Sequence, residues 1–195
     1  TEIPVVVDGK EHRTGTTIAV HSPQRHQHRL ATVHQAPPAL LQDAIDGATR
    51  AQRDWENWAF ADRAAVFMRA ADLLAGPRRM RMNAATMLGQ GKTCHQAEID
   101  AACELADFLR FNVHYAERLL HEQPISTPGV WNRLDYRPLE GFVYAITPFN
   151  FTAIGGNLPT APAILGNVSL WKPSATALLS NWIFYQILQE AGMPP

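Results

Sequence analysis

The chain has 195 residues, of which 46% are hydrophobic and 18% are charged, and its formal net charge is −1. Such a length suits one domain, or one domain with part of another, and such a composition excludes a disordered chain. The near-neutral charge provides no field that would attract nucleic acid or an anionic membrane. With two cysteines and no apolar run of about 20 residues, we expect a cytoplasmic protein, or a mitochondrial matrix protein if the source is eukaryotic.

Short strands are predicted within residues 3–34. The apolar run Val5–Val7 leads into Asp8-Gly9, which is a favoured turn pair for a hairpin. Residues 16–20 and 30–33 are further strand candidates, and the polar loop between them contains Ser22-Pro23.

Helical spacing begins after Pro37. A first helix is predicted with its apolar positions at Leu41, Ala44, Ile45, Ala48 and Trp55. A second helix is predicted with one face made of Val66, Phe67, Ala70, Leu73 and Leu74. Gly76-Pro77 should end it, because glycine accepts a left-handed cap and proline cannot continue the helix.

Two more helices are predicted in the middle of the chain. One covers residues 78–88, and a long one covers residues 95–120. At a period of 3.6 residues per turn, the inward face of the long helix should hold Ile99, Ala102, Cys103, Ala106, Leu109 and Val113.

The last third of the chain alternates strands and helices. Residues 130–137 read as a polar strand that Pro138 ends, and residues 141–147 read as an apolar strand. A helix over 152–165, a strand over 168–172 and a helix over 175–191, capped by Gly192, follow. This order is typical of a parallel α/β sheet, whose strands need neighbours on both sides. We therefore expect the chain to be part of a larger fold.

Two polar side chains follow the predicted parallel strands. Asn150 comes after the first strand, directly before a helix, and Lys172 ends the second strand. Open α/β sheets bind ligands at the carboxyl ends of their strands. An amide donor there can stabilise an oxyanion, and a lysine can donate to a nucleotide. The alternative is that Asn150 only caps the helix and Lys172 is an ordinary surface lysine.

Longer motifs contain these two residues. PFNF at 148–151 and WKPS at 171–174 resemble the aldehyde dehydrogenase superfamily, and within it the pyrroline-5-carboxylate (glutamate semialdehyde) dehydrogenases. QGKTCHQAEIDAACEL at 90–105, LRFNVHYA at 109–116 and the whole of 140–174 support the narrower resemblance. The similarity covers nearly the whole chain, although residues 1–35 are less distinctive.

The resemblance implies a fold, a cofactor and a substrate. The fold would be the N-terminal portion of a Rossmann-type parallel sheet with a preceding helical layer. Residues 1–129 would pack on the dinucleotide-binding domain, 130–140 would form an oligomerisation strand, and 141–195 would form the first half of the NAD-binding domain. The substrate would be glutamate semialdehyde, derived from pyrroline-5-carboxylate, and the enzyme a homodimer or a higher homo-oligomer.

The resemblance also implies individual roles. Asn150 would donate to the oxyanion. Phe151 would pack on the aliphatic part of the substrate, and Glu104 would face its amino end, unless Glu104 is an ordinary solvated carboxylate. The cofactor-binding residues would be Ile146, Thr147, Pro148 and Phe149 on the nicotinamide side, with Lys172, Pro173 and Ser174 at the adenosine ribose.

Some expected parts have no counterpart within these residues. In the resembling family the nucleophilic cysteine, the glutamate base and the glycine-containing cofactor turn follow the position of residue 195. Cys94 lies in a segment that precedes the nucleotide-binding strands, so it is interpreted as an ordinary helix residue. His21, His26 and His28 lack acids or cysteines at ligand spacing, so no metal site is predicted. A noncatalytic binding or assembly module, and an aldehyde dehydrogenase with another substrate, remain as alternatives.

Overall fold

The computed structural model describes residues 1–195 and begins with two small sheets. In the first, β1 pairs in parallel with β5, and β5 pairs antiparallel with β4. The second sheet is a hairpin whose turn residues Asp8 and Gly9 have φ values of 49° and 69°, as the predicted turn pair requires. The strands are β1 (Glu2–Ile3), β2 (Val5–Val7), β3 (Lys10–His12), β4 (Thr17–Ser22) and β5 (Arg25–His34).

Three helices follow, and two details of the sequence prediction are wrong. Leu41 is exposed, because α1 instead buries the neighbouring Leu40. Gly76 ends the second helix with φ −109°, so the predicted left-handed cap is absent. The helices are α1 (Pro38–Trp55), α2 (Phe60–Ala75) and α3 (Arg79–Gln90).

The long helix predicted over 95–120 is divided into three parts. A short α-helix, α4 (Cys94–Ala97), leads into the π-helix η1 (Glu98–Glu104), which continues as α5 (Leu105–His121). A π-helix has more residues per turn than an α-helix, so the predicted face loses its register. Ile99 and Cys103, both predicted to face inward, are therefore exposed, and Asp100 is buried.

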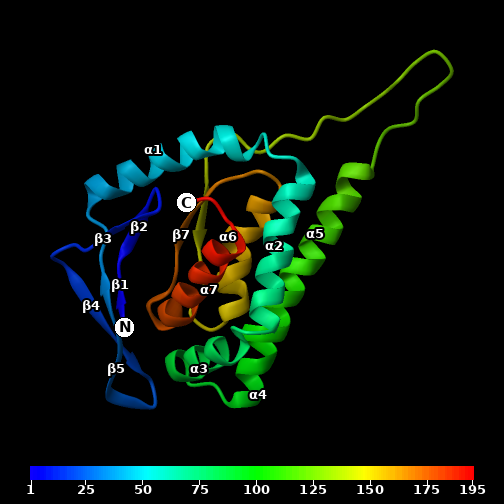
Figure 1. The fold of residues 1–195 in the computed structure, drawn as a ribbon. Coiled ribbons are helices and arrows are strands. Elements are labelled where there is room, and N and C mark those ends of the chain that lie inside the picture. The colour runs from blue at the N-terminus through cyan, green and yellow to red at the C-terminus, as the bar shows by residue number, and fades with distance from the viewer.

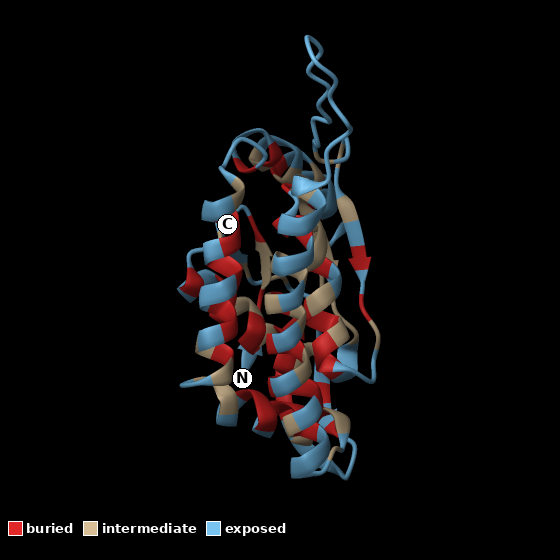
Figure 2. Cartoon of the chain, turned by 90° about the vertical axis from the view of Figure 1, so that its right-hand side faces the viewer, coloured by how far each residue is buried: buried red, intermediate tan, exposed pale blue.

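The strand predicted over 130–137 does not form. Residues 122–142 make a long arm that leaves the end of α5, projects from the body and returns to β6 (Val143–Ile146) (Figure 1). Its tip is exposed throughout (Figure 2). Strand structure needs a hydrogen-bonding neighbour, and no other strand of this chain lies beside the arm.

The last 53 residues form a strand–helix–strand–helix unit, as the sequence predicted. Strands β6 (Val143–Ile146) and β7 (Ser169–Lys172) are parallel, and α6 (Thr152–Ile164) connects them. A single turn of 3-10 helix, η2 (Ala175–Ala177), leads into α7 (Leu178–Ala191). Gly192 ends α7 with φ 101°, which is the predicted left-handed cap.

One hydrophobic core joins the helices to this unit. It is formed mainly by side chains of α2, α5, α6 and α7, including the fully buried Phe67, Leu109, Ile164 and Phe184 (Figure 2). The indole nitrogen of Trp55 donates a 2.9 Å hydrogen bond to the carbonyl oxygen of Ala163, which ties α1 to the end of α6. None of the helices combines the length and the apolar character needed to span a bilayer.

Candidate functional site

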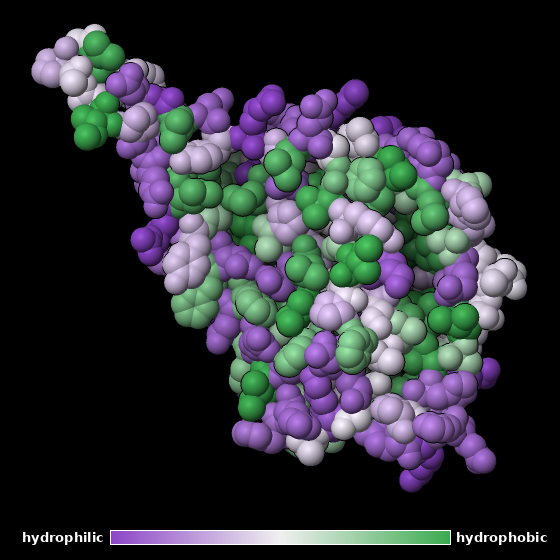
Figure 3. Space-filling view, turned by 180° about the vertical axis from the view of Figure 1, so that it is seen from behind, coloured by the Kyte–Doolittle hydropathy of each residue, from purple (hydrophilic) through white to green (hydrophobic).

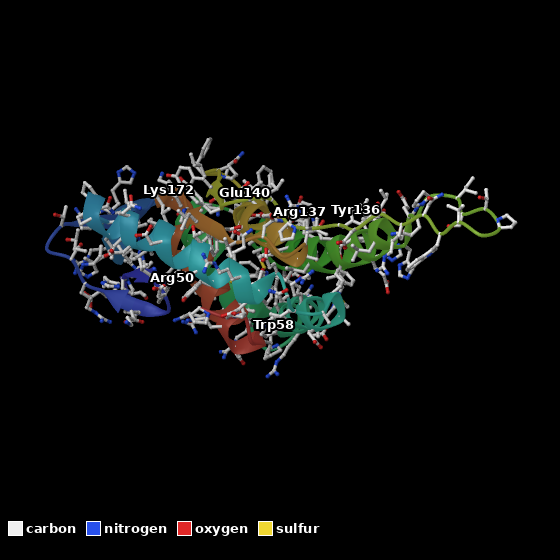
Figure 4. The ribbon with its side chains drawn as sticks, turned by 90° about the horizontal axis from the view of Figure 1, so that it is seen from above. Arg50, Trp58, Tyr136, Arg137, Glu140 and Lys172 are labelled. Atoms are coloured by element: carbon white, nitrogen blue, oxygen red, sulfur yellow. The ribbon has the colours of Figure 1, made fainter.

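The carboxyl ends of β6 and β7 form one edge of the parallel pair. Ile146 and Lys172 are register partners, and the amide of Thr147 donates a 3.2 Å hydrogen bond to the carbonyl oxygen of Lys172. Lys172 is exposed and lies on the body of the molecule, away from the projecting arm (Figure 4). Two segments that are 20 or more residues apart in the sequence therefore end side by side.

Large apolar side chains at this edge face outward. Ile146 is 59% exposed and Phe149 is 66% exposed, although apolar side chains of this size are usually buried. Figure 3 shows that exposed hydrophobic residues also lie between polar ones on the rear face of the molecule. The hydroxyl of Thr147 is buried and has no hydrogen-bond partner. The edge thus exposes apolar surface and encloses one polar group that has no partner.

The two segments that follow the strands are joined by side chains. The hydroxyl of Thr176 donates a 2.9 Å hydrogen bond to the carbonyl oxygen of Phe149, and it lies 3.4 Å from the hydroxyl of Ser174. Pro148 in one segment and Pro173 and Ser174 in the other are half-buried. The structure thus brings together the seven residues predicted for the cofactor side.

Asn150 lies at the same edge and is exposed. The alternative reading made it the cap of the following helix. However, the N-cap position of α6 is Phe151, and no side chain at that position bonds the helix. The amides of Thr152 and Ala153 are instead satisfied by Asp100, at 3.0 and 2.8 Å. The capping role therefore belongs to Asp100.

The pair of Lys92 and Asp100 was missed in the sequence analysis. The Lys92 ammonium lies 2.6 Å from a carboxylate oxygen of Asp100 and donates a 2.6 Å hydrogen bond to the carbonyl oxygen of Asn150. Asp100 was overlooked because the π-helix, which turns it inward, is not visible in a 3.6-residue period. A charged residue between apolar positions of the motif at 90–105 was the only available signal.

Phe151 and Glu104 both lie close to this pair. The Lys92 ammonium is 4.5 Å from the centre of the Phe151 ring, which is a cation–π distance. Glu104 is half-buried, and its pKa is raised, first by burial and then by the negative charge of Asp100, whereas Lys92 acts to lower it. The two predicted substrate residues therefore flank one lysine, beside Asn150.

This parallel sheet edge, with an amide before one helix and a lysine at the end of the next strand, is the arrangement expected of a nucleotide-dependent α/β enzyme. The sequence profile described as the aldehyde dehydrogenase family matches residues 10–195, so the chain belongs to that family. The predicted fold is confirmed: the chain has the N-terminal part of the aldehyde dehydrogenase fold.

Individual relatives are similar over nearly the whole chain. Delta-1-pyrroline-5-carboxylate dehydrogenase of Agaricus bisporus is 53% identical over 195 residues, covering 100% of this chain and 36% of the relative. The mitochondrial enzyme of that name from Mus musculus is 56% identical over 193 residues, covering 99% of this chain and 34% of the relative. The chain therefore spans only about a third of the length of these relatives.

Solved structures agree with the sequence comparison. The Delta-pyrroline-5-carboxylate dehydrogenase of Mycobacterium tuberculosis superposes with a TM-score of 0.98 at 56% identity, covering 100% of this chain and 36% of that one. A structure of the same protein bound with NAD gives a TM-score of 0.97 at 56% identity and covers the same shares.

Proposed function

We propose that this chain is part of an enzyme that oxidises glutamate 5-semialdehyde, formed from pyrroline-5-carboxylate, to glutamate with NAD in proline degradation. The observation that carries the proposal is that Asn150, an exposed residue, lies at the edge where Lys172 also ends its strand. The names of the relatives support the substrate, and the NAD complex of the mycobacterial relative supports the cofactor.

In this proposal Asn150 acts on the aldehyde oxygen. Its side-chain N–H donates to that oxygen as negative charge develops there during attack on the carbonyl carbon. A donor held in place before the reaction needs no reorganisation, and removing one such donor typically lowers the rate by about 10²–10³. The helix that follows Asn150 supports the position of the amide, because α6 is anchored by Asp100.

The residues at the sheet edge fit a dinucleotide. NAD, when bound, would accept the hydride that leaves the substrate carbon. The exposed Ile146 and Phe149 side chains would supply an apolar wall on the nicotinamide side, with Thr147 and Pro148 between them. Lys172 would donate to hydroxyls of the adenosine ribose, with Pro173 and Ser174 beside it.

The substrate end of the site is formed by Phe151 and Glu104. The Phe151 ring is 38% exposed and would pack on the aliphatic chain of the substrate. Glu104 would accept hydrogen bonds from the substrate ammonium, which is the strong, charge-assisted kind of contact. This pair favours an amino-acid semialdehyde over an alkyl aldehyde.

Asn150→Ala in the full-length protein tests the proposal. We expect kcat with glutamate semialdehyde and NAD to fall by about 10²–10³. Asn57→Ala, at an exposed asparagine between α1 and α2, is the matched control and should keep the parent rate. An unchanged rate in Asn150→Ala would remove the oxyanion role, and equal turnover of hexanal by the parent would remove the assigned substrate.

The projecting arm suits contact with a second copy of the protein. Residues 130–140 carry exposed hydrophobic side chains at Val130, Trp131, Leu134 and Leu139. As part of this proposal, the segment forms its strand only against a partner subunit, and the protein is a homodimer or a higher oligomer. The location would be cytoplasmic, or the mitochondrial matrix in a eukaryote, as the name of the mouse relative states for that enzyme.

A further inference from the structure

The segment Asn150–Ala153 is held at both ends by two side chains that the proposed reaction does not use. Lys92 donates to the carbonyl oxygen of Asn150 at its start, and Asp100 accepts from the amides of Thr152 and Ala153 at its end. The 2.6 Å contact between Lys92 and Asp100 closes this arrangement into one unit.

Burial makes the unit costly to leave incomplete. The Asp100 side chain is 3% exposed and the Lys92 side chain is 16% exposed. A buried carboxylate is tolerated only where hydrogen bonds and an opposite charge compensate the water it has lost. Asp100 has both, since two amides and an ammonium surround it, and its negative charge also lies at the positive end of α6.

The two side chains come from segments remote from α6. Lys92 lies in the short connection between α3 and α4, and Asp100 lies in the π-helix η1. The π-helix breaks the register that a regular α-helix would keep, as the exposure of Ile99 and Cys103 shows. The π-helix thus turns the carboxylate of Asp100 toward the start of α6. π-Helices occur frequently at functional sites.

We propose that Lys92 and Asp100 are positioning residues that fix the oxyanion amide of Asn150. This inference rests on the proposed function. Neither residue is placed on the reacting atoms. Lys92 acts through the carbonyl group of Asn150, and Asp100 acts through the first turn of α6. Lys92 also fixes the Phe151 ring through its cation–π contact, so one side chain sets the orientation of the oxyanion donor and of a substrate-facing ring.

A double-mutant cycle in the full-length protein tests the role of Lys92. We expect Lys92→Met to lower kcat about tenfold or more, and to leave the KM for NAD within about twofold, since a bond to a charged donor is worth about 1.5–3 kcal/mol. In the Asn150→Ala background the same change should lower kcat by less than about twofold, because Lys92 acts through Asn150. Lys92→Arg, which keeps the charge and the donors, should recover part of the rate.

Several outcomes would overturn the proposal. A parent-like kcat in Lys92→Met would do so, and so would an equal loss in the parent and Asn150→Ala backgrounds, which indicates an independent structural effect. Lys10→Met is the matched control, because Lys10 is exposed on β3, and it should keep the parent rate. Should Lys92→Met fold poorly, Lys92→Gln enters the same cycle.

Amide exchange separates this inference from the proposed function. If the parent does not oxidise glutamate semialdehyde, the proposed function fails, but deuterium uptake of the peptide that contains residues 150–153 can still be measured. We expect uptake there to be about tenfold faster in Lys92→Met than in Lys10→Met, because exchange reports local opening, with uptake in α2 unchanged. Equal uptake in the two variants would show that Lys92 does not hold the segment.

Discussion

The hydroxyl of Thr176 donates a 2.9 Å hydrogen bond to the carbonyl oxygen of Phe149, across the edge formed by β6 and β7. Phe149 belongs to the segment proposed for the nicotinamide, and Thr176 follows the lysine proposed for the ribose by four residues. One bond therefore links the two halves of the proposed cofactor wall.

Removing this bond should weaken cofactor binding more than folding. A neutral hydrogen bond contributes about 1 kcal/mol, so Thr176→Val should raise the Kd for NAD about fivefold. Because Thr176 is exposed, the unfolding temperature should change little. Calorimetric titration of the full-length protein with NAD is the measurement, and Thr176→Ser, which keeps the hydroxyl, is the control. Equal affinities for the valine and serine variants would contradict the prediction.

Close packing around α6 gives a prediction about stability. A Cβ added at Gly156 would lie 2.7 Å from Phe184 and 2.8 Å from Leu105, both of which are fully buried. Overpacking of this kind typically costs about 1–3 kcal/mol, so Gly156→Ala should lower the free energy of unfolding by that amount. Gly15→Ala is the matched control, since nothing lies within 4 Å of its added Cβ. Denaturant unfolding of both variants checks the difference.

The sequence predicted the elements whose determinants are local. The Asp8-Gly9 turn, the alternation from β6 to α7 and the cap at Gly192 each depend on neighbouring residues, and each was confirmed. Placing Asn150 and Lys172 at one edge required only that parallel strands end together, which the register of Ile146 and Lys172 confirms. The roles of these residues in catalysis and binding stay predictions.

The two larger errors have non-local causes. The π-helix places Asp100 in contact with Thr152, Ala153 and Lys92, which all lie outside residues 95–120, so no periodicity within that range shows these contacts. The strand expected over 130–137 needs a neighbour that this chain does not place beside the arm. Both failures concern partners distant in sequence, and the first of them hid the pair that holds Asn150.

The N-terminal sheet contains an ion pair that should respond to pH. A ring nitrogen of His34 lies 2.7 Å from the Glu2 carboxylate, and the other ring nitrogen lies 2.8 Å from the carbonyl oxygen of Thr14. The bond to Glu2 raises the pKa of His34 above its usual 6.5, and the bond to His34 lowers the pKa of Glu2 below its usual 4.5.

The two shifts define a pH window for this contribution. The stabilisation of the fold due to His34 is fully present below pH 6.5 and is lost as pH rises through the raised pKa of His34. The stabilisation of the fold due to Glu2 is fully present above pH 4.5 and is lost as pH falls through the lowered pKa of Glu2. His34→Gln should therefore lower the unfolding temperature more at pH 6 than at pH 8.5. If His34→Gln lowered the unfolding temperature equally at both pH values, the charged pair would be ruled out.

The pKa of Glu104 is raised, first by burial and then by the charge of Asp100, so the folded state binds a proton at Glu104 more readily than the unfolded state does. The effect of pH on stability is therefore opposite to that of Glu2, whose pKa is lowered. Ionised Glu104 destabilises the fold above its raised pKa, and this destabilisation disappears as pH falls below 4.5. Glu104→Gln should accordingly raise the unfolding temperature slightly at pH 7 and leave it unchanged at pH 4.

The same substitution should damage substrate binding if Glu104 accepts from the substrate ammonium. Hydrogen bonds to charged groups contribute about 1.5–3 kcal/mol, so the KM for glutamate semialdehyde should rise by about 10- to 100-fold. The KM for NAD should not change. Steady-state kinetics and thermal unfolding of the same preparation measure both effects, and Glu117→Gln, at an exposed position of α5, is the control. A Glu104→Gln variant that is more stable and binds substrate as well as the parent would identify Glu104 as an ordinary carboxylate. A group that is kept for function at the expense of stability must lose that function when it is neutralised.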